Sequence, residues 1–317
     1  METEIRALSS DFVLLLLIFG VAWFKHIGLL KEEYGQMCST LITKVTLPAV
    51  ILLTLTHADF NWNYGKMSVL ILSAAGVCLG LGWLIARAFR VNRPGTAAII
   101  LTAGFSSSNI LGVSLIGELF PSNKQMVIDT VIFSAQGTTP WLLTIGMMIA
   151  LYYGAHDLTP KQRLRETLSY FRSPIFIALV AGIALGSVTD HNNSILHSMF
   201  DGLDVVSAGN TLMVLLTVGL FVQLRDLKGV AGIAICVGFV NLIIMPLLMM
   251  PPAHVMGLEH WQIEILALEG AMPPTAMAVV LCNAYGADAR LAAKLAVTTI
   301  IASVFTIPVV FLFGGLL

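Results

Sequence analysis

Two short polar stretches interrupt otherwise apolar runs, and they carry the side chains best placed to bind a ligand. The expected substrate-binding groups in them are Ser106, Ser107, Ser108, Asn109, Pro273, Pro274 and Thr275. Hydroxyl and amide donors beside the positive N-terminal end of a half-helix form a favourable seat for a carboxylate. Hydrogen bonding between helices is the alternative role for such serines, because small polar residues often do this inside membranes.

The same stretches are expected to break the helices that contain them. Pro273 and Pro274 remove two backbone donors and clash with the preceding turn. Serines and an asparagine bond locally to backbone groups and weaken a helix in the same way. Non-helical backbone at membrane depth survives only where protein buries it or where it lines a wet cavity. The residues expected to mark helix breaks are Pro48, Gly104, Gly112 and Gly270.

Composition assigns the chain to the membrane. Of its 317 residues 57% are hydrophobic and only 11% are charged, whereas soluble domains carry roughly 25% charged residues. The net charge of −1 provides no overall basic field for nucleic acid. The four cysteines and seven histidines show no metal-site spacing, so no metal or cofactor is expected. No nucleophile, base and orienting group can be assembled, and the chain is not expected to be an enzyme.

Ten segments are apolar enough to cross a bilayer of roughly 30 Å as helices. The expected fold is therefore an all-α integral membrane protein with ten transmembrane helices. The spans are Phe12–Phe24, Cys38–Leu55, Met67–Ala88, Thr96–Phe120, Val127–Tyr153, Pro174–Val188, Val205–Leu224, Val230–Met250, Ile263–Tyr285 and Leu291–Leu312.

Basic residues collect on one side of this arrangement. Of the 17 lysines and arginines, 14 fall on the side that carries the connection 154–173, and only Arg6, Lys66 and Lys124 fall on the other. Short cytoplasmic loops collect positive charge. This predicts a multi-pass protein of the cell membrane, the inner membrane of a bacterium, with both termini outside the cytoplasm.

The two halves are expected to be inverted repeats. Residues 1–153 and 174–317 each hold five spans, separated by the cytoplasmic linker 154–173, and an odd number reverses the second half in the membrane. Landmarks recur at a nearly constant offset: Gly104 corresponds to Gly270, 166 residues later, and Pro140 corresponds to Pro308, 168 residues later. Broken helices at corresponding positions, here spans 4 and 9, indicate a binding site near the membrane midplane.

The chain resembles the auxin efflux carrier family over essentially its full length. The resemblance rests on His26-Ile27-Gly28-Leu29-Leu30, Val45-Thr46-Leu47-Pro48-Ala49, Ala271-Met272-Pro273-Pro274-Thr275, Ala284-Tyr285-Gly286-Ala287-Asp288 and Ser303-Val304-Phe305-Thr306-Ile307-Pro308. It implies that spans 4 and 9 cross at their breaks and that an elevator-like swing of one bundle carries small organic anions. A homodimer is also implied.

The sequence departs from the family pattern at positions that bear on the substrate. Ser106-Ser107-Ser108 replace the Pro-Asn-Thr of plant members, Asn241 stands where a lysine is common, and Lys44 replaces a frequent asparagine. Lys44 either extends to the cytoplasmic face or attracts the anion in place of the lysine missing at Asn241. Lys44 and Asn241 are both candidate substrate-binding residues.

Three further polar residues have two interpretations each. Gln136 and Thr139 either line the cavity or form structural hydrogen bonds. Glu269, four residues before Pro273, either pairs structurally or couples transport to an ion.

The sequence therefore predicts a secondary transporter of a small organic anion, a mono- or dicarboxylate, with coupling to a proton or sodium ion open. Two alternatives remain: a cation/proton antiporter of similar fold, which would favour an intramembrane aspartate pair, and a membrane sensor that binds ligand without transport.

The predicted orientation has a direct test. A cysteine at Thr159, in a background without the native cysteines, should resist an impermeant thiol reagent in intact cells and react after permeabilisation. Labelling from outside in intact cells would contradict the predicted orientation.

Overall fold

The computed structural model of the chain describes residues 15–56, 62–107, 130, 137–154, 159–188, 194–222 and 228–314. Within these ranges the protein is all-helical, and the only β-type pairing is one isolated bridge between Ser106 and Pro274. This confirms an all-α protein.

Five of the predicted spans are present as single apolar helices long enough to cross a membrane. They are Glu33–Thr56, Gly65–Ala88, Phe200–Phe221, Ala231–Val255 and Ala289–Ile307. A sixth is formed if Leu164–Arg172 and Pro174–Gly186, which are bent by 44° to one another, count as one span. The chain is thus a multi-pass membrane protein, and the helix Leu15–His26 is a shorter apolar segment at its start.

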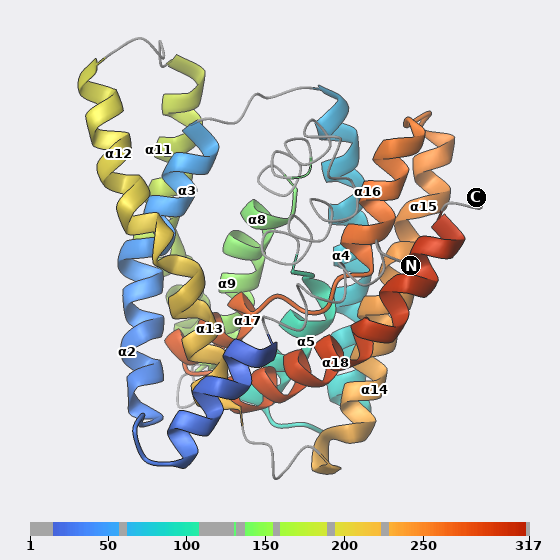
Figure 1. Cartoon of the computed structure of the whole chain (residues 1–317), viewed down its shortest axis with the longest axis horizontal. Coiled ribbons are helices and arrows are strands. Elements are labelled where there is room, and N and C mark those ends of the chain that lie inside the picture. The colour runs from blue at the N-terminus through green and yellow to red at the C-terminus, as the bar shows by residue number, and fades with distance from the viewer. Residues whose placement is uncertain are drawn as a thin grey trace.

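The helices divide into two groups, and each group draws on both halves of the chain (Figure 1). In the first group α11 (Pro174–Val188) and α12 (Ser194–Ala208) pack on α3 (Leu47–Thr56), and α13 (Asn210–Phe221) packs on α2 (Glu33–Leu41). The helix Leu15–His26 joins this group, because Gly219 of α13 lies against Val21.

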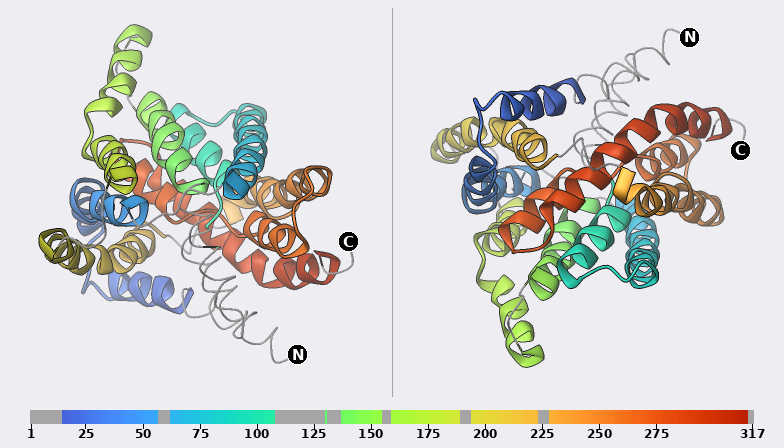
Figure 2. Two further views of the ribbon diagram at one scale, coloured as in Figure 1. Left: turned by 90° about the horizontal axis from the view of Figure 1, so that it is seen from above. Right: turned by 90° about the horizontal axis from the view of Figure 1, so that it is seen from below.

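The second group is built around two helix pairs. In one pair α4 (Trp62–Ala88) packs on α5 (Arg93–Gly104), and in the other α15 (Met245–Val255) packs on α16 (His260–Gly270). The remaining members are α8 (Thr138–Trp141), α9 (Met147–Gly154), α14 (Ala231–Phe239), α17 (Met277–Ala284) and α18 (Ala289–Gly314). Figure 2 shows the division from above and below, with α2 and α3 on one side and α4, α14 and α15 on the other.

Short connecting helices complete the described chain. Three turns are π-helical: η1 (Ile42–Thr46), η3 (Leu142–Gly146) and η7 (Val240–Ile244). On the side of the basic connections, α10 (Pro160–Leu168) leads into the 3₁₀ turn η4 (Ser169–Arg172) before α11. A second 3₁₀ turn, η6 (Lys228–Val230), precedes α14.

The helix break predicted at Pro48 is instead a widened turn. The chain stays helical from Glu33 to Thr56, and the π-turn η1 ends two residues before Pro48. η7 likewise ends two residues before Pro246. A proline lacks the N–H donor and crowds the carbonyl one turn earlier, and a π-turn relieves that crowding without ending the helix.

Two other predicted boundaries also differ. α15 continues past the predicted end at Met250, through Pro251 and Pro252, to Val255. The span predicted to begin at Val205 begins by Phe200. Asp201 and Asp204 lie within α12 with exposed side chains, so their charges do not prevent this part of the span from being helical.

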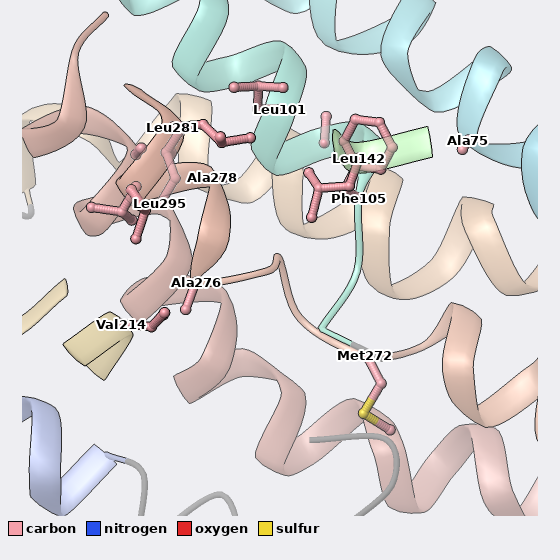
Figure 3. Packing of buried hydrophobic residues seen from close by; sticks show 14 of the residues in the cluster. Ala75, Leu101, Phe105, Leu142, Val214, Met272, Ala276, Ala278, Leu281 and Leu295 are labelled. Carbon is pink, nitrogen blue, oxygen red and sulfur yellow. The ribbon is translucent and has the colours of Figure 1, made fainter. Parts of the chain in front are cut away.

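α5, α17 and α18 meet in a buried apolar core beside the helix breaks. Leu101 of α5, Leu281 of α17 and Leu295 of α18 are fully buried and lie in this cluster (Figure 3). Phe105, the first residue after α5, is also buried and lies next to Leu142 in the same view. This core holds the end of α5 and the start of α17 in place.

The glycines that end α5 and α16 pack directly on neighbouring helices. A Cβ atom at Gly104 would lie 2.6 Å from Cγ of Leu79, and one at Gly270 would lie 2.9 Å from Cα of Pro246. The side-chain Cε of Met249 also lies close to Gly270, but the Pro246 atom belongs to the backbone and cannot move aside as a side chain can. Gly270 therefore permits α16 to contact α15 where the helix ends.

Gly270→Ala should lower the free energy of unfolding by about 1 to 3 kcal/mol, the usual cost of overpacking a well-packed interior. Gly76→Ala is the matched control, because nothing lies within 4 Å of a Cβ at that position. Thermal unfolding of both variants in detergent, followed by tryptophan fluorescence, measures the difference. Equal midpoints would contradict this close packing.

Candidate functional site

The two interrupted helices meet backbone to backbone. α5 ends at Gly104 and α16 ends at Gly270, the positions predicted for the breaks. The Ser107 N–H donates to the carbonyl of Pro273 (2.8 Å), and the Thr275 N–H donates to the carbonyl of Phe105 (3.0 Å). These bonds flank the antiparallel bridge between Ser106 and Pro274. The unwound segments thus supply each other with the hydrogen bonds that their own helices no longer make.

This crossing has a local two-fold relation. As in any antiparallel bridge, exchanging Phe105 with Pro273 and Ser107 with Thr275 converts one of the two hydrogen bonds into the other. The packing repeats the relation, because Gly104 lies against Leu79 of α4 and Gly270 lies against Pro246 of α15. The two helix ends are therefore held in closely similar surroundings.

A cavity of about 320 Å³ lies beside the crossing, between the two groups of helices. α3, α11, α12 and α13 line it from the first group, and the crossing, α8 and the start of α17 line it from the second. Its polar lining residues are Thr54, Ser106, Ser107, Thr138, Thr139, Ser207, Asn210, Thr211 and Thr275. No charged side chain is among the described residues that line it. The volume is at the lower end of the range for small-molecule sites, roughly 300 to 1,000 Å³.

Several polar groups in the lining are held in fixed positions. Thr46 donates its hydroxyl hydrogen to Oδ1 of Asn210 (2.9 Å), across the interface between η1 and α13. This bond orients the Asn210 amide and leaves its N–H donors for other partners. The Thr275 hydroxyl accepts a hydrogen bond from the N–H of Met277, the first residue of α17 (3.3 Å). The positive N-terminal end of α17 therefore borders the cavity.

The structure brings together some of the predicted site residues. Ser106, Ser107 and Thr275 line the cavity, while Pro273 and Pro274 form the crossing beside it. Thr139, for which a structural hydrogen bond was also considered, lines the cavity as well. Ser108, Asn109, Gly112 and Gln136 lie outside the described residues.

Lys44 and Asn241 lie elsewhere. Lys44 lines a second cavity, together with Arg172 and Tyr170, and not the cavity at the crossing. Asn241 is fully buried on η7, where its Nδ2 donates to the carbonyl of Ala103 (3.5 Å). Asn241 therefore stabilises the last turn of α5 from the side away from the cavity. It does not face the cavity.

Glu269 occupies the last turn of α16, one residue before that helix ends. Its side chain is 1% exposed, although a carboxylate rarely becomes so buried without a specific role. This position places a titratable group next to the unwound segment, as the sequence suggested.

The sequence interpretation missed the contribution of the first group of helices. Asn210, Thr211 and Ser207 on α12 and α13 line the cavity, and so does Thr54 on α3. A signal was present, because Ser207, Asn210 and Thr211 are spaced three to four residues apart and share one face of a helical span. Only the packing of α13 against α2 shows which way that face points.

Two residues of the second group form polar contacts with the first group on the side of the basic connections. Arg290, at the start of α18, forms an ion pair with Glu32, which precedes α2 (Nε to Oε1, 2.6 Å). Asn283 of α17 donates to Oγ of Ser39 (2.9 Å) and to the carbonyl of Gly35 (3.3 Å), both on α2. A relative displacement of the groups would have to break these contacts.

In the described part of the chain, no three His, Cys, Asp or Glu side chains gather as a metal site would require. The candidate site therefore consists of hydroxyl groups, amide groups and helix ends.

Comparison with known proteins gives one family and several full-length relatives. The family model described as "Membrane transport protein" matches residues 8–311. An "uncharacterized transporter" of Methanothermobacter thermautotrophicus is 23% identical over 301 residues, covering 93% of this chain and 94% of the relative. The uncharacterized transporter MJ1031 of Methanocaldococcus jannaschii is 21% identical, covering 98% and 99%. The uncharacterized transporter YfdV of Escherichia coli is 18% identical and covers 88% of each chain.

Proposed function

Because the chain belongs to the membrane transport protein family, of the auxin efflux carrier type, we propose that it is a secondary transporter of a small organic anion. The substrate class is a mono- or dicarboxylate, and the binding site is the cavity beside the crossing. The observation that carries the proposal is the chemistry of this cavity, which offers hydroxyl and amide donors and a helix N-terminus at a break in two membrane helices.

The cavity suits an anion although no cation lines its described part. A carboxylate needs several hydrogen-bond donors when it leaves water, and Ser106, Ser107 and Asn210 can supply them. The positive end of α17 adds a favourable electrostatic contribution. The absence of a carboxylate from the described lining is also consistent with an anionic ligand, since a like charge would repel it.

Transport requires that the cavity open to each side of the membrane in turn. We propose that the second group of helices moves as a body against the first, in an elevator-like cycle, and carries the crossing with it. The location of the cavity between the two groups supports this, since movement along that interface changes its access.

The proposed architecture has ten helices in two inverted repeats, residues 1–153 and 174–317. The helix ends at Gly104 and Gly270, at corresponding places in the two halves, support an inverted relation between them. We further propose that the protein lies in the inner membrane of a bacterium and that both of its termini lie outside the cytoplasm. A homodimer, implied by the family, would be measured by light scattering of the purified protein.

The site proposal predicts that loss of two hydroxyl groups weakens substrate binding. A thermal-shift screen of small carboxylates first selects a ligand, since a ligand that binds the native state raises its stability. For that ligand, Ser106→Ala combined with Ser107→Ala should raise Kd at least tenfold, because each hydrogen bond to a charged group contributes about 1.5 to 3 kcal/mol. Uptake into proteoliposomes should fall in parallel.

Ser73→Ala is the control for this experiment. The Ser73 hydroxyl donates to the Leu70 carbonyl within α4 (2.8 Å) and does not line the cavity. This variant should keep both binding and uptake. Normal uptake by the double serine variant would place the substrate elsewhere.

The elevator proposal predicts that tying the groups together stops transport. Glu32→Cys with Arg290→Cys, in a background without the native cysteines, replaces the ion pair that joins them. A reducible bifunctional thiol reagent should abolish uptake, and a reductant should restore it. The control pair His260→Cys with Glu264→Cys lies within α16, so its cross-link should leave uptake intact. Full uptake with the first cross-link in place would exclude movement along this interface.

We propose that Glu269 carries a coupling proton, since its carboxyl group is buried next to the helix break. Glu269→Gln resembles the protonated form, so reconstituted protein should still exchange labelled for unlabelled substrate. It should fail to accumulate substrate under an imposed pH gradient. Glu264→Gln, on the same helix but away from the break, should accumulate normally. Gradient-driven accumulation by Glu269→Gln would rule out this role.

A further inference from the structure

A second cavity, of about 330 Å³, lies between the same two groups of helices, on the side that carries the basic connections. Lys44, Arg172, Tyr170 and Ser173 line it from the first group, and Met147 and Tyr285 line it from the second. It is separate from the cavity at the crossing. Leu143, 1% exposed, lines the crossing cavity, whereas Met147, one turn later and 2% exposed, lines this one.

The lining of the second cavity is positively charged. Lys44 and Arg172 both reach it, and no carboxylate is among its described lining residues. Within the described ranges neither cation takes part in an ion pair or hydrogen bond. Both side chains are exposed, and an anion in the cavity would interact favourably with both of them.

A buried hydroxyl group near this cavity lacks a partner in the described part of the chain. The Tyr170 ring is 1% exposed and packs edge-on against Phe171 and Phe176, with centroid distances of 5.4 and 5.3 Å. Its hydroxyl group is buried and has no hydrogen-bond partner in the described part of the chain. A buried hydroxyl without a partner is costly, so Tyr170 is a weak point in the packing beside the cavity.

The start of α11 adds to the positive potential. Ser173 precedes this 15-residue helix, and its Oγ accepts a hydrogen bond from the Phe176 N–H (3.2 Å). The cavity is bordered by Ser173 and Pro174, so it faces the N-terminal end of the helix, where the macrodipole favours an anion.

We propose that this second cavity is an oxyanion-binding site, distinct from the cavity at the crossing, that takes a carboxylate or phosphate group. Lys44 and Arg172 supply the charge, and the N-terminal end of α11 adds to the positive potential. The proposal does not depend on transport through the crossing, because its groups belong to another cavity. The same chemistry fits a soluble oxyanion and the phosphate of a lipid headgroup.

The test uses the full-length chain in detergent with Ser106→Ala and Ser107→Ala already introduced, so that binding at the crossing is weakened and the variants below assign any remaining binding to one cavity. Isothermal titration calorimetry with malonate, inorganic phosphate and short-chain phosphatidylglycerol measures the affinity. Binding of malonate or phosphate identifies a soluble oxyanion, and binding of phosphatidylglycerol alone identifies a lipid headgroup. No binding of any of the three probes overturns the proposal.

Side-chain changes then locate the bound probe. Lys44→Gln and Arg172→Gln should each weaken binding at least tenfold, whereas Lys44→Arg should keep part of the affinity because it keeps the charge. Arg165→Gln is the matched control, since Arg165 is exposed on the neighbouring α10 and does not line the cavity. Equal losses in Arg165→Gln and Arg172→Gln would indicate only a general charge effect and would overturn the site.

Discussion

The structure depends on the two backbone hydrogen bonds by which the interrupted helices pair with each other. Breaking a helix inside a membrane leaves N–H and C=O groups that lipid cannot satisfy, at a cost of several kcal/mol for each group. Phe105 and Ser107 in one unwound segment form hydrogen bonds with Thr275 and Pro273 in the other, so each segment satisfies backbone groups of the other. Neither break would be tolerable alone, and the two halves of the chain must therefore meet here.

The surrounding helices are shaped to permit this meeting. Gly104 and Gly270 end their helices where a Cβ atom would collide with Leu79 and Pro246. Asn241 supports the same region from behind through its bond to the Ala103 carbonyl. The crossing is consequently enclosed on one side by close packing and open on the other to a polar cavity, which directs any ligand to that side.

The location of charge separates the two cavities. The described lining of the cavity at the crossing contains only neutral polar and apolar side chains, so recognition there would depend on hydrogen-bond donors and the α17 dipole. Lys44 and Arg172 lie at the other cavity, near the basic connections. A lysine is less costly there than at the midplane, because it can reach water. This explains how the chain keeps Lys44 in an otherwise apolar span.

Much of this organisation follows from the sequence alone. Long apolar runs predict helices, and five of the predicted spans are single helices in the structure. The breaks at Gly104 and Gly270 follow from missing donors and competing side chains. These are local properties, since hydropathy and the lack of an N–H belong to the residues themselves. The family resemblance, carried by Ala271 to Thr275 and the stretches around it, is likewise present in the sequence.

Other features depended on how the helices pack. Pro48 does not end its helix, because a π-turn absorbs the strain, and Pro251 and Pro252 lie inside α15. Lys44 was grouped with the serines of span 4 but lines another cavity, while Asn210 and Thr211 reach the crossing cavity from a helix given no site residue. The rotation of each helix about its axis decides which polar side chains share a cavity. That rotation is set by contacts between segments far apart in the chain, which hydropathy and spacing do not encode.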